Sequence, residues 1–128
     1  MTENLVDIQK LCVRFDGARK VHAINDLTLT LKQGETMALL GESGSGKSVT
    51  LKTLLRLLPP KRSTIEGDIV VNGVDVLTLS GKKLQAYRGE EVSMVFQEPG
   101  LALDPVYTVG DQIAESVMRH KGVRKEEA

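Results

Sequence analysis

The sequence has no tryptophan, one cysteine and few aromatic residues. Phenylalanine and tyrosine together make up 3% of its 128 residues, which argues against the stacking platforms that single-strand nucleic-acid binders use. Cys12 cannot form a disulfide within the chain, because it has no partner. It lies among alternating apolar residues, and this setting predicts a small core residue.

The sequence also has no excess of charge of one sign and no long apolar run. Lysine plus arginine and aspartate plus glutamate both number 17, so no overall field favours nucleic acid or an anionic membrane. No stretch approaches the ~20 apolar residues that cross a bilayer. The first ten residues contain acids and lack the apolar core of a secretory signal. We therefore expect a soluble, cytoplasmic protein that binds no nucleic acid and does not itself insert into a membrane.

The most informative stretch, residues 41–48, reads GESGSGKS and fits the phosphate-loop (P-loop) pattern. Its glycines let successive backbone N–H groups face one concavity that suits the phosphates of a nucleotide. Lys47 would reach the β- and γ-phosphates, and the Ser48 hydroxyl would bind Mg²⁺. A Gly/Ser linker before a helix is the alternative. The candidate nucleotide-binding residues here are Gly41, Glu42, Ser43, Gly44, Ser45, Gly46, Lys47, Ser48 and Val49.

The residues around the loop predict the strand–loop–helix context that the motif requires. Residues 36–40 form a short apolar run typical of a buried strand, and residues 49–58 carry apolar side chains at helical spacing. Pro59 and Pro60 then stop the helix.

Other elements follow from alternation and turn chemistry. Residues 11–15 and 27–31 alternate as two strands of an antiparallel layer, followed by a turn at 32–35. Asn72-Gly73 predicts a hairpin turn between strands at 69–71 and 74–77. We also expect a helix over 80–88 and a buried strand over 92–96. Thr108 to Asp111 is a capping pattern that predicts a helix with Ile113, Ala114 and Val117 facing inward.

Four segments, which together span nearly the whole chain, read in order GETMALLGESGSGKSVT, GDIVVNGVDV, VSMVFQEP and TVGDQIAES. In sequence and order they resemble the nucleotide-binding subunits of ABC transporters. Within that family, the chain most resembles importers of dipeptides, oligopeptides, glutathione and nickel.

The resemblance implies an α/β fold, the N-terminal part of a P-loop NTPase of the ABC type. An antiparallel β layer would lie beside a partial parallel core sheet with the P-loop helix. We expect the β layer and P-loop core over about 1–96, the glutamine loop over 97–107 and the start of the helical subdomain over 108–128. The implied cofactors are ATP and Mg²⁺.

The resemblance also implies roles for single residues. Gln97 matches the glutamine that contacts Mg²⁺ and its water and senses the γ-phosphate, and it joins Lys47 as a catalytic candidate. A solvent-exposed strand-end residue is its alternative reading. Phe15 is the candidate for stacking on adenine, a core role is about equally favoured, and Arg19 and His22 are alternatives by spacing.

Partners and location follow in the same way. Loop 97–105 would face transmembrane permease subunits, and a second ATP-binding subunit would complete the ATP site. The protein would then be peripheral at the inner face of the cell membrane.

The sequence also departs from the family pattern. The signature sequence, the Walker B acidic strand, the catalytic glutamate and the switch histidine do not occur in it. Residues 79–81 read Leu-Ser-Gly, but two lysines follow and the segment precedes Gln97, so we interpret it as a helix start. Asp75 follows a hairpin strand and is a poor substitute for the Walker B aspartate.

Residues 100–105 read GLALDP where relatives have Met-Thr-Ser-Leu-Asn-Pro, and Gly100 removes a large side chain from the loop that would face the permease. The resemblance implies an ATP-binding subunit of an importer of peptides or similar small solutes, which binds Mg·ATP to energise transport. We expect these residues by themselves not to hydrolyse it. The alternative is a truncated, non-hydrolysing nucleotide-binding module. A small kinase or GTPase has less support, because the strands before the loop and VFQEP fit the ABC pattern better.

Overall fold

The computed structural model describes residues 4–42, 44–97 and 99–128. The chain divides into two compact units, Met1–Gly81 and Lys82–Ala128, each described by itself below. Within the described ranges, no helix is both long enough and apolar enough to cross a membrane.

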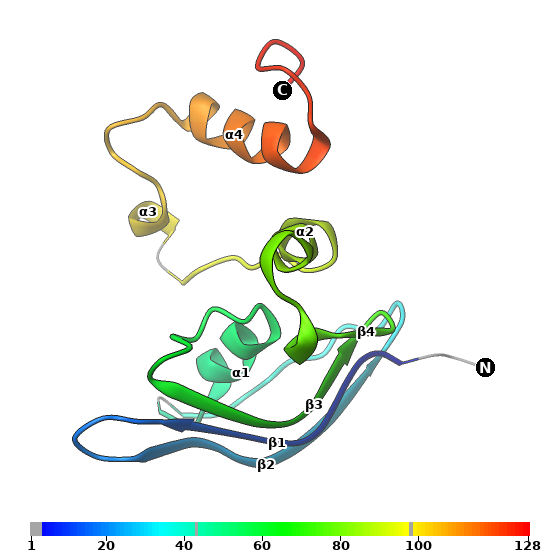
Figure 1. The fold of residues 1–128 in the computed structure, drawn as a ribbon, viewed down its shortest axis with the longest axis vertical. Helices are drawn as coiled ribbons and strands as arrows, with labels where there is room; N and C mark the ends of the chain where they lie inside the picture. The colour runs from blue at the N-terminus through cyan, green and yellow to red at the C-terminus, as the bar shows by residue number, and fades with distance from the viewer. Residues whose placement is uncertain (1–3, 43, 98) are drawn as a thin grey trace. The chain divides into compact units, whose positions relative to one another are not determined.

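A four-stranded antiparallel sheet forms the base of the first unit (Figure 1). Its strands are β1 (Asn4–Phe15), β2 (Val21–Lys32), β3 (Ser63–Val71) and β4 (Val74–Asp75), in the order β2-β1-β3-β4. A short 3-10 helix, η1 (Val76–Thr78), follows β4. Both strands predicted for the antiparallel layer are confirmed as β1 and β2, and each is longer than the alternating segment, 11–15 or 27–31, that predicted it.

The predicted hairpin turn is also confirmed. Asn72 and Gly73 adopt φ values of 49° and 77°, the left-handed pair that a two-residue hairpin loop requires. Val71 and Val74 pair directly across the turn.

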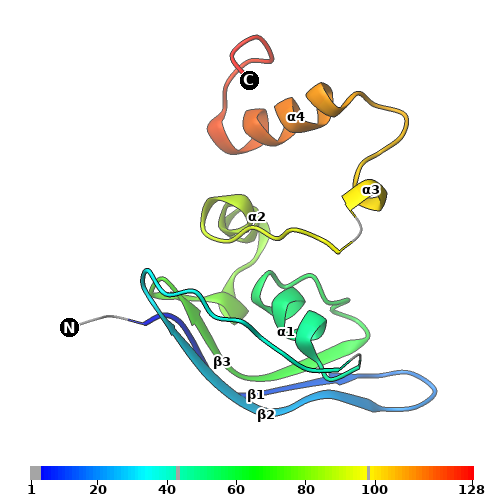
Figure 2. The ribbon, with the colours of Figure 1, turned by 180° about the vertical axis from the view of Figure 1, so that it is seen from behind.

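A bulge bends the sheet in its middle, and the bend is visible from both sides (Figures 1 and 2). The pairing of β1 with β3 shifts between Gln9 and Cys12, where Lys10 has a φ of 50°. Opposite the bulge, Gly67 has a φ of 111°, and a Cβ there would lie 2.5 Å from the Lys10 carbonyl oxygen. Only glycine fits the sheet at that position without displacing β1.

Helix α1 (Lys47–Leu54) lies over one face of the sheet (Figures 1 and 2). It begins two residues before the predicted helix and ends four residues earlier. Arg56 has a φ of 53°, its N–H bonds the Thr53 carbonyl at 3.0 Å, and the Leu57 N–H bonds the Lys52 carbonyl at 2.9 Å. This Schellman arrangement, rather than Pro59, terminates the helix. The buried apolar residues of this unit are Ile8, Leu11, Val13, Ile24, Leu55, Leu58, Ile69, Val71 and Val76.

The predicted parallel core strands do not form, which corrects that part of the fold expectation. Residues 36–40 have no strand assignment, and residues 92–96 make only one bridge, between Arg88 and Val92. Leu40 is 89% exposed and Val95 is 92% exposed. A strand exists only through hydrogen bonds to a neighbour, and no neighbouring strand for either run lies in the described part of the chain.

The second unit is helical. It contains α2 (Gly81–Glu90), whose last residues include non-helical Arg88 and Gly89, then α3 (Pro99–Ala102) and α4 (Val109–Lys121). The predicted cap of α4 is confirmed, since Thr108 Oγ1 accepts a hydrogen bond from the Asp111 N–H at 3.1 Å. The expected inward position of Ile113 is wrong: its side chain is 58% exposed, and α4 buries no residue.

Candidate functional site

The P-loop adopts a backbone that depends on its glycines. Gly44 and Gly46 have φ values of 83° and 95°, and the Ser45 N–H bonds the Glu42 carbonyl at 3.1 Å. A Cβ on Gly46 would lie 2.8 Å from the Ala23 carbonyl oxygen of β2. The tight turn at Gly46 therefore brings the loop against the sheet, while Ser43 lies outside the described residues.

Lys47 spans the loop from its far end. Its Nζ donates a hydrogen bond to the Gly41 carbonyl oxygen, and the residue is half-buried. The partner of this ammonium is therefore a neutral carbonyl at the start of the loop. An anionic oxygen is a stronger acceptor for the same group, so the geometry suits an exchange of partners when an anion enters.

The N-terminus of α1 opens on the loop without a competing acid. Gly46 is the N-cap and makes no side-chain capping hydrogen bond, and the first turn has no acidic residue. Free N–H groups and the helix dipole favour an anion at such an end. Ser48 is exposed and Val49 is half-buried on this first turn.

A pocket of about 270 Å³ lies between β2 and the P-loop. One side is formed by residues 23–27 of β2, the other by the loop, the start of α1 and the segment before the loop. The lining residues are Ala23, Ile24, Asn25, Asp26, Leu27, Leu39, Leu40, Ser45, Gly46, Lys47 and Thr50.

The three candidates for contact with the adenine base lie at different places on the sheet. Phe15 ends β1 half-buried and, by strand alternation, shares the face of buried Val13, on which α1 packs. His22 is exposed and pairs with Arg14 on the opposite face. Arg19 is exposed in the turn between β1 and β2.

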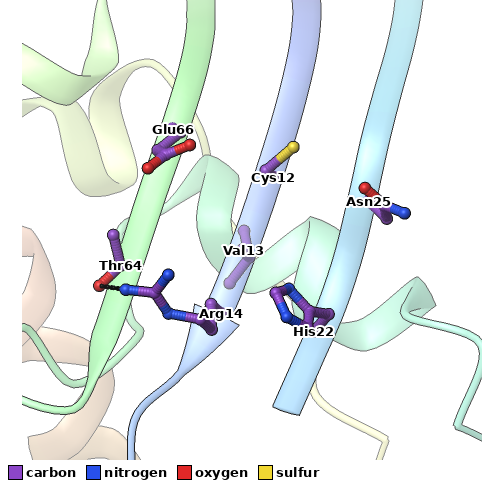
Figure 3. Close-up of a pocket in the computed structure, with 7 residues that line it drawn as sticks. All are labelled: Cys12, Val13, Arg14, His22, Asn25, Thr64 and Glu66. Atoms are coloured by element: carbon purple, nitrogen blue, oxygen red, sulfur yellow. Dashed lines mark hydrogen bonds between the residues drawn. The ribbon is translucent and has the colours of Figure 1, made fainter. Parts of the chain in front are cut away.

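That opposite face carries a second, smaller pocket of about 170 Å³ (Figure 3). Arg14 donates to Asp16 at 3.0 Å and to Thr64 at 3.4 Å, and Thr64 donates to Asp16 at 3.0 Å. The Arg14 bond and then the Thr64 bond hold the pKa of the Asp16 carboxyl below its usual value. Arg14 is thus paired within the protein rather than presented to a ligand.

Cys12 also lines this pocket, half-buried, and its Sγ accepts the Asp26 N–H at 3.3 Å. The expected core position of Cys12 is therefore wrong, because the residue lies on the outer face of β1.

Gln97 belongs to the second unit, where its side chain is exposed. The loop that follows it contains α3 and is hydrogen-bonded to Gln112 of α4, a residue that the sequence analysis did not single out. Gln112 donates from Nε2 to the Asp104 carbonyl at 2.9 Å and the Tyr107 carbonyl at 3.0 Å, and its Oε1 accepts the Asp104 N–H at 2.9 Å. A glutamine on an exposed helix turn gives no sequence signal of such a role.

A metal site built from the protein alone is not found among the described residues, where no three His, Cys, Asp or Glu side chains gather. Mg²⁺ in nucleotide sites binds one or two protein groups together with phosphate oxygens and water. The exposed Ser48 hydroxyl fits that kind of site, and Gln97 stays a prediction.

Comparisons with known proteins identify the same family as the order of the sequence motifs. Residues 24–128 match the model of the ABC transporter family. The chain is 43% identical over 130 residues to the ABC transporter ATP-binding protein YejF of Escherichia coli, covering all of this chain and 25% of YejF. It is 41% identical over 128 residues to the dipeptide transport ATP-binding protein DppD of Bacillus subtilis, covering 98% of this chain and 38% of DppD.

The chain therefore spans between a quarter and two fifths of the length of these relatives. A solved structure of the ATP-binding cassette MJ0796, a dimer in a post-hydrolysis state bound to ADP and Pi, superposes with a TM-score of 0.72. The match covers 90% of this chain and 47% of that one at 23% identity, which confirms the cassette fold.

Proposed function

Since the chain belongs to the ABC transporter family, we propose that it forms the phosphate-binding part of an ATP-binding subunit that energises import of peptides or similar small solutes. The observation that carries this proposal is the P-loop, with glycines at the positions of positive φ and Lys47 reaching back to Gly41. The names of YejF and DppD as ATP-binding proteins, and of DppD as a dipeptide transport protein, support it.

In this proposal, the N–H groups of residues 43–48 bind the α- and β-phosphates, and Lys47 exchanges the Gly41 carbonyl for β- and γ-phosphate oxygens. Ser48 binds Mg²⁺. Phe15 stacks on adenine, supported by its place on the face of the sheet that carries α1. Gln97 keeps the role that the family resemblance implies, contact with Mg²⁺ and its water and sensing of the γ-phosphate.

We assign loop 97–105 to contact with transmembrane permease subunits, and a second ATP-binding subunit to the other half of the ATP site. Leu101 is 82% exposed and Leu103 is 44% exposed within this loop, and exposed apolar side chains are typical of a contact surface. The protein would then act at the cytoplasmic, inner face of the membrane.

These 128 residues contain no signature sequence and no Walker B strand. We therefore expect nucleotide binding without turnover when they act alone. A purely nucleotide-binding module, with no role in transport, is the second candidate function. Both predict no steady-state ATPase activity above background, and turnover that disappears in Lys47→Ala would overturn that expectation.

Titration calorimetry with Mg·ATP tests the binding proposal. Lys47→Ala should weaken binding about 10- to 100-fold, because a hydrogen bond to a charged group contributes ~1.5–3 kcal/mol. Lys52→Ala is the matched control, since Lys52 is exposed in the last turn of the same helix, and it should bind like the unmodified protein. Equal affinity in all three proteins, or a preference for GTP, would contradict the proposal.

A further inference from the structure

Two threonines of α1 are buried on the side that faces the core. Thr50 is 4% exposed and Thr53 is 0% exposed. Each hydroxyl donates to the carbonyl four residues earlier, Thr50 to Gly46 at 2.8 Å and Thr53 to Val49 at 2.6 Å. A buried hydroxyl needs such a partner, because burial without one is costly.

The two bonds are chemically alike but end on different kinds of residue. Val49 lies inside the helix, where its carbonyl is already fixed by the regular backbone pattern. Gly46 is the left-handed N-cap, with a φ of 95°, and among the described residues it is Thr50 that bonds its carbonyl to the helix. That carbonyl accepts both the Thr50 N–H at 2.9 Å and the Thr50 hydroxyl.

The orientation of the Gly46 carbonyl also sets the orientation of an N–H group in the P-loop. The Gly46 carbonyl and the Lys47 N–H belong to one planar trans peptide and point in opposite directions. With the carbonyl directed along α1 toward Thr50, the Lys47 N–H points out of the helix end. Thr50 itself lines the pocket of about 270 Å³ together with Gly46 and Lys47.

We propose that Thr50 is a positioning residue for phosphate binding, whose hydroxyl fixes the Gly46–Lys47 peptide so that its N–H faces the phosphates. This inference rests on the proposed nucleotide binding. Thr50 touches no phosphate and acts through the Gly46 carbonyl. Its conservative replacement is serine, which keeps the hydroxyl, whereas valine keeps the shape and removes the bond.

The test compares Thr50→Val, Thr50→Ser and Thr53→Val by titration with Mg·ADP and with Mg²⁺-pyrophosphate, which has phosphates and no base. Thr50→Val should bind both ligands about 3- to 10-fold more weakly, the effect of one hydrogen bond. Thr50→Ser and Thr53→Val should stay within about twofold of the unmodified protein. In the free protein, the amide NMR shift of Lys47 should move in Thr50→Val and not in Thr53→Val.

Several results would overturn the inference. They are unchanged affinity in Thr50→Val, an equal loss in Thr53→Val, or a loss in Thr50→Ser as large as in Thr50→Val. If Thr50→Val does not fold, Thr50→Ala removes the same hydroxyl without adding a methyl group and is read by the same criteria. Failure of the unmodified protein to bind Mg·ADP would refute the proposed function itself, and the role of Thr50 with it.

Discussion

The two units of this chain are stabilised in different ways. In Met1–Gly81 the sheet and α1 enclose side chains such as Ile8, Leu11 and Ile69, each 0% exposed. In the described residues of Lys82–Ala128, Tyr87 is the one apolar side chain buried to a similar degree. Burial therefore dominates the first unit, and capping and polar hydrogen bonds dominate the second.

The apolar side chains of the second unit are exposed instead. Val95 is 92% exposed, and Leu101 and Val106 are each 82% exposed. Apolar surface of this kind contributes to stability only when it is covered. The P-loop therefore belongs to a unit with its own core, whereas the second unit, Lys82–Ala128, has few buried apolar side chains.

The largest expected effect on stability comes from a cavity in the core of the first unit. Ile69→Ala should destabilise the first unit by about 2–5 kcal/mol, because it leaves a cavity in a packed core. Ile113→Ala, at a side chain that is 58% exposed, should change stability by less than about 0.5 kcal/mol. Urea unfolding followed by circular dichroism measures both. Equal losses would show that the second unit has a core as well packed as the first.

A glycine in the sheet gives the next largest effect. Gly67→Ala should cost about 2–3 kcal/mol, since φ is 111° and the new Cβ would lie 2.5 Å from the Lys10 carbonyl oxygen. Gly73→Ala is the control, because φ there is 77° and no atom lies within 4 Å of its Cβ position. It should cost only about 1 kcal/mol. A smaller loss at Gly67 than at Gly73 would mean that the bulge adapts to the added atom.

In the second unit, the buried Tyr87 should make stability depend on pH. Burial, and then the nearby charge of Glu91, raise the pKa of Tyr87 to about 12 from an ordinary value of 10.0. The native state thus favours the neutral phenol, so its contribution is complete below pH 10 and is lost as pH rises toward 12.

In that window, stability should fall by up to about 1.4 kcal/mol per pH unit from this group. Tyr87→Phe should flatten the alkaline part of the stability curve, and Tyr107→Phe, at a side chain 62% exposed, should leave it unchanged. Identical curves for the two variants would contradict the buried position of Tyr87.

The smallest effect concerns the cap of α4. Thr108→Ala removes the acceptor for the Asp111 N–H and should destabilise the helix by about 1 kcal/mol. Thr108→Ser keeps the hydroxyl and serves as the control. Amide exchange in residues 109–113 should accelerate in the alanine variant alone. Equal exchange in both variants would show that the helix end does not depend on this cap.

Local chemistry was predictable from the sequence wherever one or two residues determine a conformation. Asn72-Gly73 forms the predicted turn, and Thr108 caps the predicted helix. The helical spacing of apolar residues over 49–58 predicted the start of α1 to within two residues. Each of these features depends on contacts within about four residues, so the sequence alone is sufficient to specify it.

Features that depend on distant pairing were not predictable in the same way. Residues 36–40 have the composition of a buried strand but no partner in the described chain. The bulge at Lys10 is possible because Gly67 of β3 has no Cβ, which would lie 2.5 Å from the Lys10 carbonyl oxygen. Thr50 in the candidate site was missed because its bond to the carbonyl four residues earlier gains a role only once Gly46 is known to be the N-cap of α1.

The three hydrogen bonds of Gln112 have a mechanical consequence. They join residues 104 and 107 to the first turn of α4, so they resist a displacement of the loop relative to the helix. A force applied at Asp104 or Tyr107 would be transmitted to α4 through them. Its 13 residues span about 20 Å at 1.5 Å per residue, long enough to turn a small shift at one end into a larger one at the other.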